Sequence, residues 1–379
     1  MLGLYVHIPF CSAICNYCNF NRGLFDPALK QRYVPALLDE ITRAGDGSPA
    51  DTIFFGGGTP SLLEPAEIAA IIARLRDSCG VTAAADSTLE ANPETVTPAR
   101  LTGFLEAGVT RLSYGVQSLR DAELGRLSRL HSAQRARAAV AEARAAGFEN
   151  LSLDLMMWLP EQTVAQWTES VDGLIALEPD HASLYILELY PNAPLRETMS
   201  RSKWSLAPDD DAADMYLAAM ERLDLAGFRQ YEISNVARPG RASRHNLKYW
   251  TEGEWLGFGC GAHSTRHGVR WKNVSGTEDY IAAVAHEGRT RVEERVLSPQ
   301  VQLEEALFTR MRLSEGVSLT EVGGRFGVDV WARYGPSLLR FMDAGMDLLI
   351  YDGDRLRLTR SGMLLANEIV AVFIEPPMR

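Results

Sequence analysis

Three cysteines near the start of the chain, Cys11, Cys15 and Cys18, have a spacing that can hold an iron–sulfur cluster. The apolar run Leu2–Ile8 leads directly into them, so the thiols are expected at the C-terminal end of a first strand. Three thiolates can bind three irons of a [4Fe-4S] cluster and leave the fourth iron open. A zinc site would need a fourth ligand at similar spacing, and a disulfide would leave one thiol unpaired. We therefore interpret the three cysteines as cluster ligands.

The C-x3-C-x2-C spacing of these cysteines resembles the signature of the radical S-adenosylmethionine (SAM) superfamily. The preceding residues, Y-x-H-I-P-F-C over Tyr5–Cys11, resemble the oxygen-independent coproporphyrinogen III oxidase group. That group includes the oxidase itself and a heme chaperone branch, HemW. The resemblance implies a [4Fe-4S] cluster held by three cysteines, with SAM as an exchangeable ligand of the open iron.

Short apolar runs alternate with amphipathic segments over the first half of the chain. The expected strands are Leu2–Ile8, Thr52–Phe55, Thr88–Ala91, Arg111–Val116, Leu151–Leu155 and Ala182–Leu187. The expected helices are Pro27–Arg43, Pro65–Asp77, Pro98–Ala107, Ser132–Ala146 and Val164–Ala176. This alternation predicts a parallel sheet, and a closed (β/α)8 barrel would need two more units. The predicted fold class is α/β, an open six-stranded (β/α)6 partial barrel of the radical SAM type.

A glycine-rich run, Gly56–Pro60, follows the second expected strand. Ligands gather at the carboxyl ends of strands in such folds, and glycine lets the backbone approach a ligand closely. The run is similar to the GGGTP element that receives the methionine moiety of SAM in the family. The resemblance therefore implies SAM contacts from Gly57, Gly58 and Thr59.

Acids that follow strands are often only helix caps. The resemblance implies instead that Glu90 contacts one SAM molecule. It also implies that Gln117, Arg129 and Asp154 line a second SAM-sized pocket. Two tyrosines, Tyr5 and Tyr17, lie beside the cluster in the matching motif.

The chain departs from the family at the end of the fifth strand. The family pattern resembles G-L-P-G-Q-T, whereas residues 158–163 read W-L-P-E-Q-T. An indole, Trp158, and a carboxylate, Glu161, replace the two glycines. We expect these larger side chains to narrow the second SAM pocket.

Three features separate the oxidase from the heme chaperone branch. The oxidase carries a fourth cysteine, where this chain has Phe20, and an N-terminal extension, whereas this chain reaches Tyr5 almost at once. The chaperone branch carries H-N-x-x-Y-W, which stands here as His245–Trp250. The resemblance implies that His245 offers an imidazole to heme iron and that Tyr249 and Trp250 pack on the porphyrin. Without the family, a lone histidine is more often a structural residue.

We expect a radical SAM-type [4Fe-4S] protein that binds heme and transfers it to an unidentified acceptor protein, with no catalytic residue assigned. One alternative is anaerobic coproporphyrinogen III oxidase, which decarboxylates its substrate to protoporphyrinogen IX. Another is a radical SAM enzyme with a different substrate. Either enzyme would need an electron donor, and product analysis would separate it from a carrier.

The overall composition limits the partners. A net charge of −11 argues against a nucleic-acid partner, because phosphate binding needs a clustered basic surface. No run approaches the ~20 apolar residues of a membrane span, and no signal-like segment opens the chain. The isolated Cys79 and Cys260, with an odd cysteine count, fit a reducing compartment. We expect a cytoplasmic protein without an integral membrane segment.

Three segments are expected along the chain. Residues 1–200 form the partial barrel with the cluster loop, residues 201–290 extend it and carry the H-N-x-x-Y-W motif, and residues 291–379 form a smaller helical, winged-helix-like domain. A Pro- and Ser-containing connector is expected over Asn192–Pro208. Asp352-Gly353 lies between two apolar alternations and predicts a hairpin. Because no basic recognition helix is present, we interpret the last domain as a packing lid.

Overall fold

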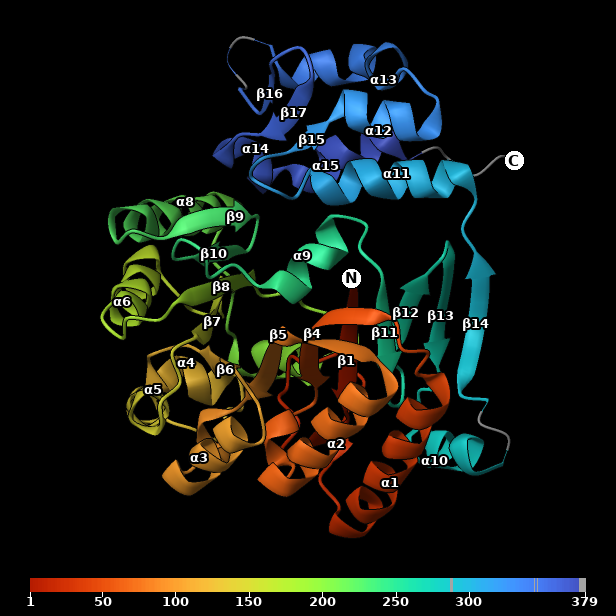
Figure 1. Ribbon diagram of the computed structural model, residues 1–379. Coiled ribbons are helices and arrows are strands. Elements are labelled where there is room, and N and C mark those ends of the chain that lie inside the picture. Colours follow the sequence, from red (N-terminus) through yellow and green to blue (C-terminus); the bar gives the residue numbers. More distant parts are fainter. Residues whose placement is uncertain (287–288, 344, 346, 375–379) are drawn as a thin grey trace.

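The computed structural model describes residues 1–286, 289–343, 345 and 347–374. Within these residues six parallel strands lie side by side in one sheet (Figure 1). They are β1 (Leu2–Ile8), β4 (Pro49–Gly57), β5 (Gly80–Ala91), β6 (Arg111–Gln117), β7 (Leu151–Met157) and β8 (His181–Ile186). The prediction of an open α/β fold with a six-stranded parallel core is confirmed.

The sheet extends beyond these six strands on both sides, which the sequence did not predict. Next to β1 lie parallel β11 (Trp255–Phe258) and then antiparallel β12 (His263–Arg266), β13 (Val269–Asn273) and β14 (Arg291–Val296). Next to β8 lie antiparallel β10 (Asn235–Ala237) and β9 (Arg229–Glu232). These added strands are three to six residues long, so their periodicity is weak. The three-segment division stays a prediction, although strands of the second segment pair within the sheet of the first.

Helices cover the outer face of the sheet (Figure 1). They are α1 (Pro27–Ala44), α2 (Pro65–Ser78), α3 (Pro98–Glu106), α4 (Asp121–Arg126), α5 (Ala133–Ala146), α6 (Val164–Ile175) and α8 (Asp209–Leu225). Leu4, Val6 and Ile8 of β1 belong to the buried core beneath these helices. Because side chains alternate along a strand, Tyr5 and His7 face the opposite, concave side of the sheet. We call this concave side the lumen.

A buried carboxylate joins α1 to the added strands. Glu40 accepts hydrogen bonds from the Gly259 N–H (2.7 Å), the Asn273 amide (2.6 Å), the Tyr280 hydroxyl (2.6 Å) and the Thr290 hydroxyl (2.9 Å). Tyr280 belongs to α10 (Thr277–His286). Four donors satisfy a carboxylate that would otherwise be costly to bury. The contact fixes the β11–β13 region against the helical layer.

The Pro- and Ser-containing connector Asn192–Pro208 includes a helix, α7 (Pro194–Ser202). Leu195 and Met199 of α7 bury their side chains in a small apolar cluster, and Pro194 favours helix initiation at that position. Four short 3-10 helices are also present: η1 (Pro60–Leu62), η2 (Pro93–Thr95), η3 (Leu339–Phe341) and η4 (Ala371–Phe373).

The C-terminal domain packs beside α9 (Arg244–Trp250), which lies between the sheet and α11 (Figure 1). Its helices are α11 (Pro299–Arg310), α12 (Leu319–Phe326), α13 (Val330–Leu338), α14 (Arg360–Leu364) and α15 (Ala366–Val370). The predicted hairpin forms β16 (Leu349–Tyr351) and β17 (Arg355–Leu358), and β15 (Val317–Ser318) adds a third strand. None of the helices described is long and apolar enough to cross a membrane.

Candidate functional site

The cysteine loop lies at the C-terminal end of β1. Cys11 ends the short strand β2 (Phe10–Cys11), which pairs with β3 (Gly23–Leu24), and the loop between them carries Cys15 and Cys18. All three thiols are free. Burial raises the pKa of Cys11, and the neighbouring Cys18 and Cys15 raise it further. The structure therefore brings the three predicted ligands together at the expected end of the sheet.

The glycine-rich turn after β4 supports this loop through its backbone. The Gly58 N–H donates to the Ile8 carbonyl (2.8 Å), and the Thr59 N–H donates to the Phe10 carbonyl (2.7 Å). A Cβ atom on Gly58 would lie only 2.6 Å from the Phe10 carbonyl oxygen, so the close approach requires glycine. The Thr59 hydroxyl lies 3.7 Å from the Cys11 sulfur. The predicted SAM-binding turn is thus also a support of the cysteine loop.

Arg129 connects the cysteine loop to the neighbouring strands. Its guanidinium donates to the Cys15 sulfur (3.4 Å), to the Asn92 side-chain oxygen (2.8 Å) and to the Gly115 carbonyl (2.6 Å). Gln117 adopts a positive φ of 66° at the end of β6, which turns the chain near Gly115. A Cβ atom on Gly115 would lie within 3.5 Å of Gln117, Asn92 and Arg129, so these side chains converge there.

Glu90 and Asp154 face the lumen with Tyr5. A Cβ atom on Gly56 would lie 2.9 Å from the Tyr5 ring and 3.2 Å from a Glu90 carboxylate oxygen, which places Gly56 between them. Burial, followed by the nearby Asp154 charge, raises the pKa of Glu90 to about 8. Burial raises the pKa of Asp154 to about 6 against the opposing hydrogen bond from Ser183. These carboxyl groups would lose their protons most readily next to a cationic ligand.

The H-N-x-x-Y-W motif lies toward the other end of the strands. His245 hydrogen-bonds through Nδ1 to the Thr52 hydroxyl (2.9 Å) and through Nε2 to the Tyr249 hydroxyl (2.9 Å), and its ring stacks on Phe54. Burial lowers the pKa of His245 to about 3. Trp250 points elsewhere, since the Arg312 guanidinium lies 4.4 Å from its ring centre. The structure therefore joins His245 to Tyr249 but not to Trp250.

The two residues that replace family glycines hold a nearby segment. Trp158 and Glu161 have φ angles of 62° and 57°, which glycine adopts more easily. The Trp158 indole donates to the Ala207 carbonyl (2.8 Å), and the Glu161 carboxylate accepts from the Ser205 N–H (2.7 Å). Both side chains are thus engaged by the segment after α7. Narrowing of a second SAM pocket by them stays a prediction.

Two asparagines that sequence reasoning missed anchor the cysteine loop. Asn16 donates to the Arg126 carbonyl (2.8 Å), and its own carbonyl accepts from the Leu195 N–H of α7 (2.9 Å). Asn21 donates to the Cys260 carbonyl (3.1 Å). A Cβ atom on the next residue, Gly261, would lie only 2.4 Å from the Asn21 amide nitrogen. The run of glycines around Cys260 was the available signal, because it indicated a close backbone approach.

Comparisons with known proteins agree with this geometry. Residues 5–174 match the model of the radical SAM superfamily, and residues 297–365 match the HemN C-terminal domain. The heme chaperone HemW of Bacillus subtilis is 35% identical over 382 residues, which cover 99% of each chain. HemW of Lactococcus lactis is 31% identical, covering 98% of this chain and 96% of that protein. This chain belongs to the HemW family of radical SAM proteins.

A solved structure shows the same fold as this HemW-family chain. The structure of the Escherichia coli coproporphyrinogen III oxidase HemN, a radical SAM enzyme, matches with a TM-score of 0.85 and 22% identity. The match covers 98% of this chain and 89% of that one. At this identity the likeness establishes the fold alone.

The radical SAM family implies a [4Fe-4S] cluster and SAM, and the residues around the cysteine loop fit both. No group of three His, Cys, Asp or Glu side chains in the described part of the chain is arranged to hold a single metal ion. The side-chain oxygen of Gln117 and the Nε atom of Arg129 are buried with no hydrogen-bond partner among the described residues. Buried polar atoms normally have partners, so these two atoms are suited to a polar ligand.

Alanine substitution of Cys11, Cys15 or Cys18 should each abolish the broad visible absorption of the anaerobically reconstituted protein, because each thiolate holds one iron. Cys79→Ala and Cys260→Ala are matched controls, since both residues are buried, free cysteines. They should retain the absorption. Its loss in a folded Cys79 or Cys260 variant would show that the ligand set is wrong.

Glu90→Gln should flatten the pH dependence of stability in the ligand-free protein. The folded-state pKa of Glu90, about 8, lies above its ordinary value of 4.5, so the folded state holds a proton that the unfolded state releases. The wild-type melting temperature should therefore fall as pH rises from 4.5 through 8, and the melting temperature of the variant should fall less over the same range. Glu106→Gln, at an exposed position on α3, is the control and should follow the wild type. Identical pH profiles for Glu90→Gln and wild type would contradict the assignment.

Proposed function

We propose that this protein binds heme and passes it to an acceptor protein, as a heme chaperone. The observation that carries the proposal is the placement of α9, which sets the Tyr249 ring between the lumen and a cavity beside the C-terminal domain. The relatives named heme chaperone HemW match this chain from end to end, which supports the same role. Phe20, at the position of the fourth cysteine of the oxidase, is 65% exposed and supplies no ligand.

In this proposal the cluster and SAM lie at the C-terminal ends of the parallel strands, which we call the rim. Cys11, Cys15 and Cys18 would bind the cluster, and Gly57, Gly58 and Thr59 would lie against SAM. When bound, the reduced cluster and SAM supply one-electron chemistry that no side chain can provide. The further polar contacts proposed for SAM come from six side chains: Tyr5, Tyr17, Glu90, Gln117, Arg129 and Asp154.

The H-N-x-x-Y-W motif would contribute to the heme site at the other end of the lumen. His245 is buried and neutral, and it fixes the Tyr249 hydroxyl. Tyr249 presents its ring to the cavity, whereas the Trp250 ring packs against Arg312 and does not line that cavity. The heme acceptor would be a separate protein, and any reductive cleavage of SAM would need an electron donor.

Titration of heme into the reconstituted full chain tests the proposal, with a parallel anaerobic assay of coproporphyrinogen III decarboxylation. The wild type should bind heme and give no stoichiometric decarboxylated product. His245→Ala should weaken heme binding more than Tyr249→Phe, because the latter keeps the ring and loses one hydrogen bond worth about 1 kcal/mol. The absorption of the cluster should be unchanged in both variants.

Two results would contradict this function. One is robust conversion of coproporphyrinogen III to protoporphyrinogen IX, which would make the protein an oxidase. The other is an absence of saturable heme binding by the wild-type protein. Wild-type heme affinity in His245→Ala would exclude a role for the motif in heme binding.

A further inference from the structure

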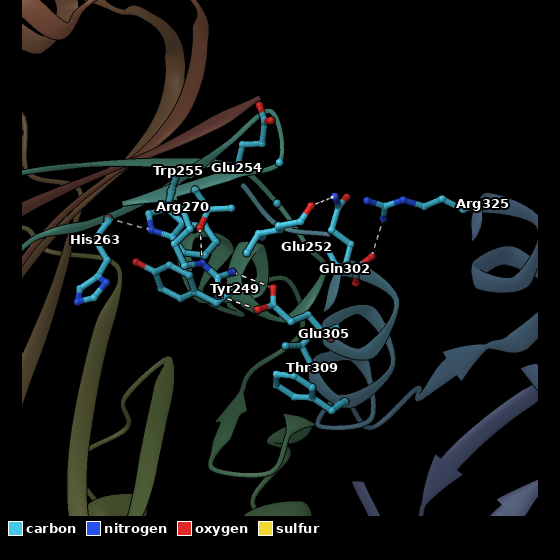
Figure 2. Close-up of a pocket in the computed structure, with 15 residues that line it drawn as sticks. Tyr249, Glu252, Glu254, Trp255, His263, Arg270, Gln302, Glu305, Thr309 and Arg325 are labelled. Atoms are coloured by element: carbon cyan, nitrogen blue, oxygen red, sulfur yellow. Dashed lines mark hydrogen bonds and ion pairs between the residues drawn. The ribbon is translucent and has the colours of Figure 1, made fainter. Parts of the chain in front are cut away.

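A cavity of about 390 Å³ lies between the β11–β13 strands and the C-terminal domain. Figure 2 shows His263 and Trp255 on the strands, Tyr249 on α9, and Arg325 on the side of the C-terminal domain. The rings of Tyr249 and Trp255 meet edge to face, with centroids 4.7 Å apart. Phe308 adds a third aromatic ring from α11. The lining also carries three carboxylates and two guanidinium groups, from Glu252, Glu254, Glu305, Arg270 and Arg325. An aromatic wall bordered by charged groups suits a largely apolar ligand with polar substituents.

His263 is the histidine that lines this cavity. Its side chain is exposed, and its ring has no hydrogen-bond partner among the described residues. Partial burial and the nearby Lys272 lower the pKa of His263, which favours the neutral imidazole, the form that binds iron. His245, by contrast, uses both ring nitrogens in hydrogen bonds to Thr52 and Tyr249.

Most other histidines in the described residues are occupied. Their ring partners are the Tyr5 hydroxyl and Asn21 carbonyl for His7, the Val116 carbonyl and Glu94 for His131, Ser152 and Tyr231 for His181, and Glu254 for His267. His286 ends α10 and does not line the cavity. His263 is therefore the imidazole available to an iron in this cavity.

Cationic side chains lie next to His263. Lys272 is its direct cross-strand neighbour, and Arg270 is the neighbour of Thr265. Lys272, 25% exposed, pairs with Glu293, 67% exposed (2.6 Å), and Arg325, 51% exposed, pairs with Glu252, 13% exposed (2.9 Å). Each pair has one member in solvent, and ion pairs at a protein surface contribute little to stability, so these cations can exchange their partners for the carboxylates of a ligand.

We propose that His263 would bind the heme iron in this cavity, with the porphyrin against the ring of Tyr249 or Trp255 and a propionate directed to Lys272, the cross-strand neighbour of His263. The inference rests on the proposed heme-binding function. It assigns His245 a different task from iron ligation: its hydrogen bond to the Tyr249 hydroxyl orients the ring that forms the wall, so His245 is a positioning residue.

The test is a heme titration of the reconstituted full chain, followed by absorption and electron paramagnetic resonance spectra of the bound heme. His263→Ala should weaken binding by about tenfold or more, because loss of even an outer-shell partner costs about 10- to 100-fold in metal affinity. Its spectrum should lose the signature of nitrogen ligation, and added imidazole should restore that signature. His267→Ala, four residues further on the same hairpin, is the control and should match the wild type.

His245→Ala should weaken heme binding while it keeps the histidine-ligated spectrum, and imidazole should not restore its affinity. Wild-type affinity and spectrum in His263→Ala would overturn the inference, as would rescue of His245→Ala, and not of His263→Ala, by imidazole. In both cases the wild type still binds heme, so the proposed function stands. A wild-type protein that binds no heme contradicts the function itself, which keeps the two failures distinguishable.

Discussion

The backbone contact between the glycine-rich turn and the cysteine loop is the constraint on which the site depends. Gly58 and Thr59 donate to carbonyls of Ile8 and Phe10, so the end of β4 fixes the path of the chain just after β1. No side chain fits at Gly58, because its Cβ would meet the Phe10 carbonyl. The parallel pairing of β1 with β4 brings these two segments to the same end of the sheet. The thiols therefore meet where the strands end.

The lumen connects this rim to the far end of the strands. Tyr5 stacks on Phe54, and Phe54 stacks in turn on His245. Side chains from β1, β4 and α9 thus form one continuous layer between the Glu90 region and Tyr249. In the proposed function this layer separates SAM at the rim from heme beside α9, while both remain attached to the same strands.

Local patterns were sufficient to predict the six parallel strands and the position of the cysteine loop. Cys11 and the Gly56–Pro60 turn follow apolar runs directly, and such runs are read from periodicity. The added strands β9–β14 could not be predicted this way, because they are short and gain their stability from pairing with distant strands. The links made by Asn16 and Asn21 span residues far apart in sequence, so no local pattern identifies the partners, although the glycines around Cys260 indicated a close backbone approach there.

The sequence motif also could not show how its own members divide. His245 and Trp250 belong to one short helix, yet one faces Thr52 in the lumen and the other packs under Arg312. That division follows from where α9 lies between the sheet and the C-terminal domain.

The central claim, a cluster with an open iron facing SAM, is tested most directly by electron paramagnetic resonance of the reduced, reconstituted protein with and without saturating SAM. The account predicts a changed cluster signal when SAM is added, and identical spectra would contradict it.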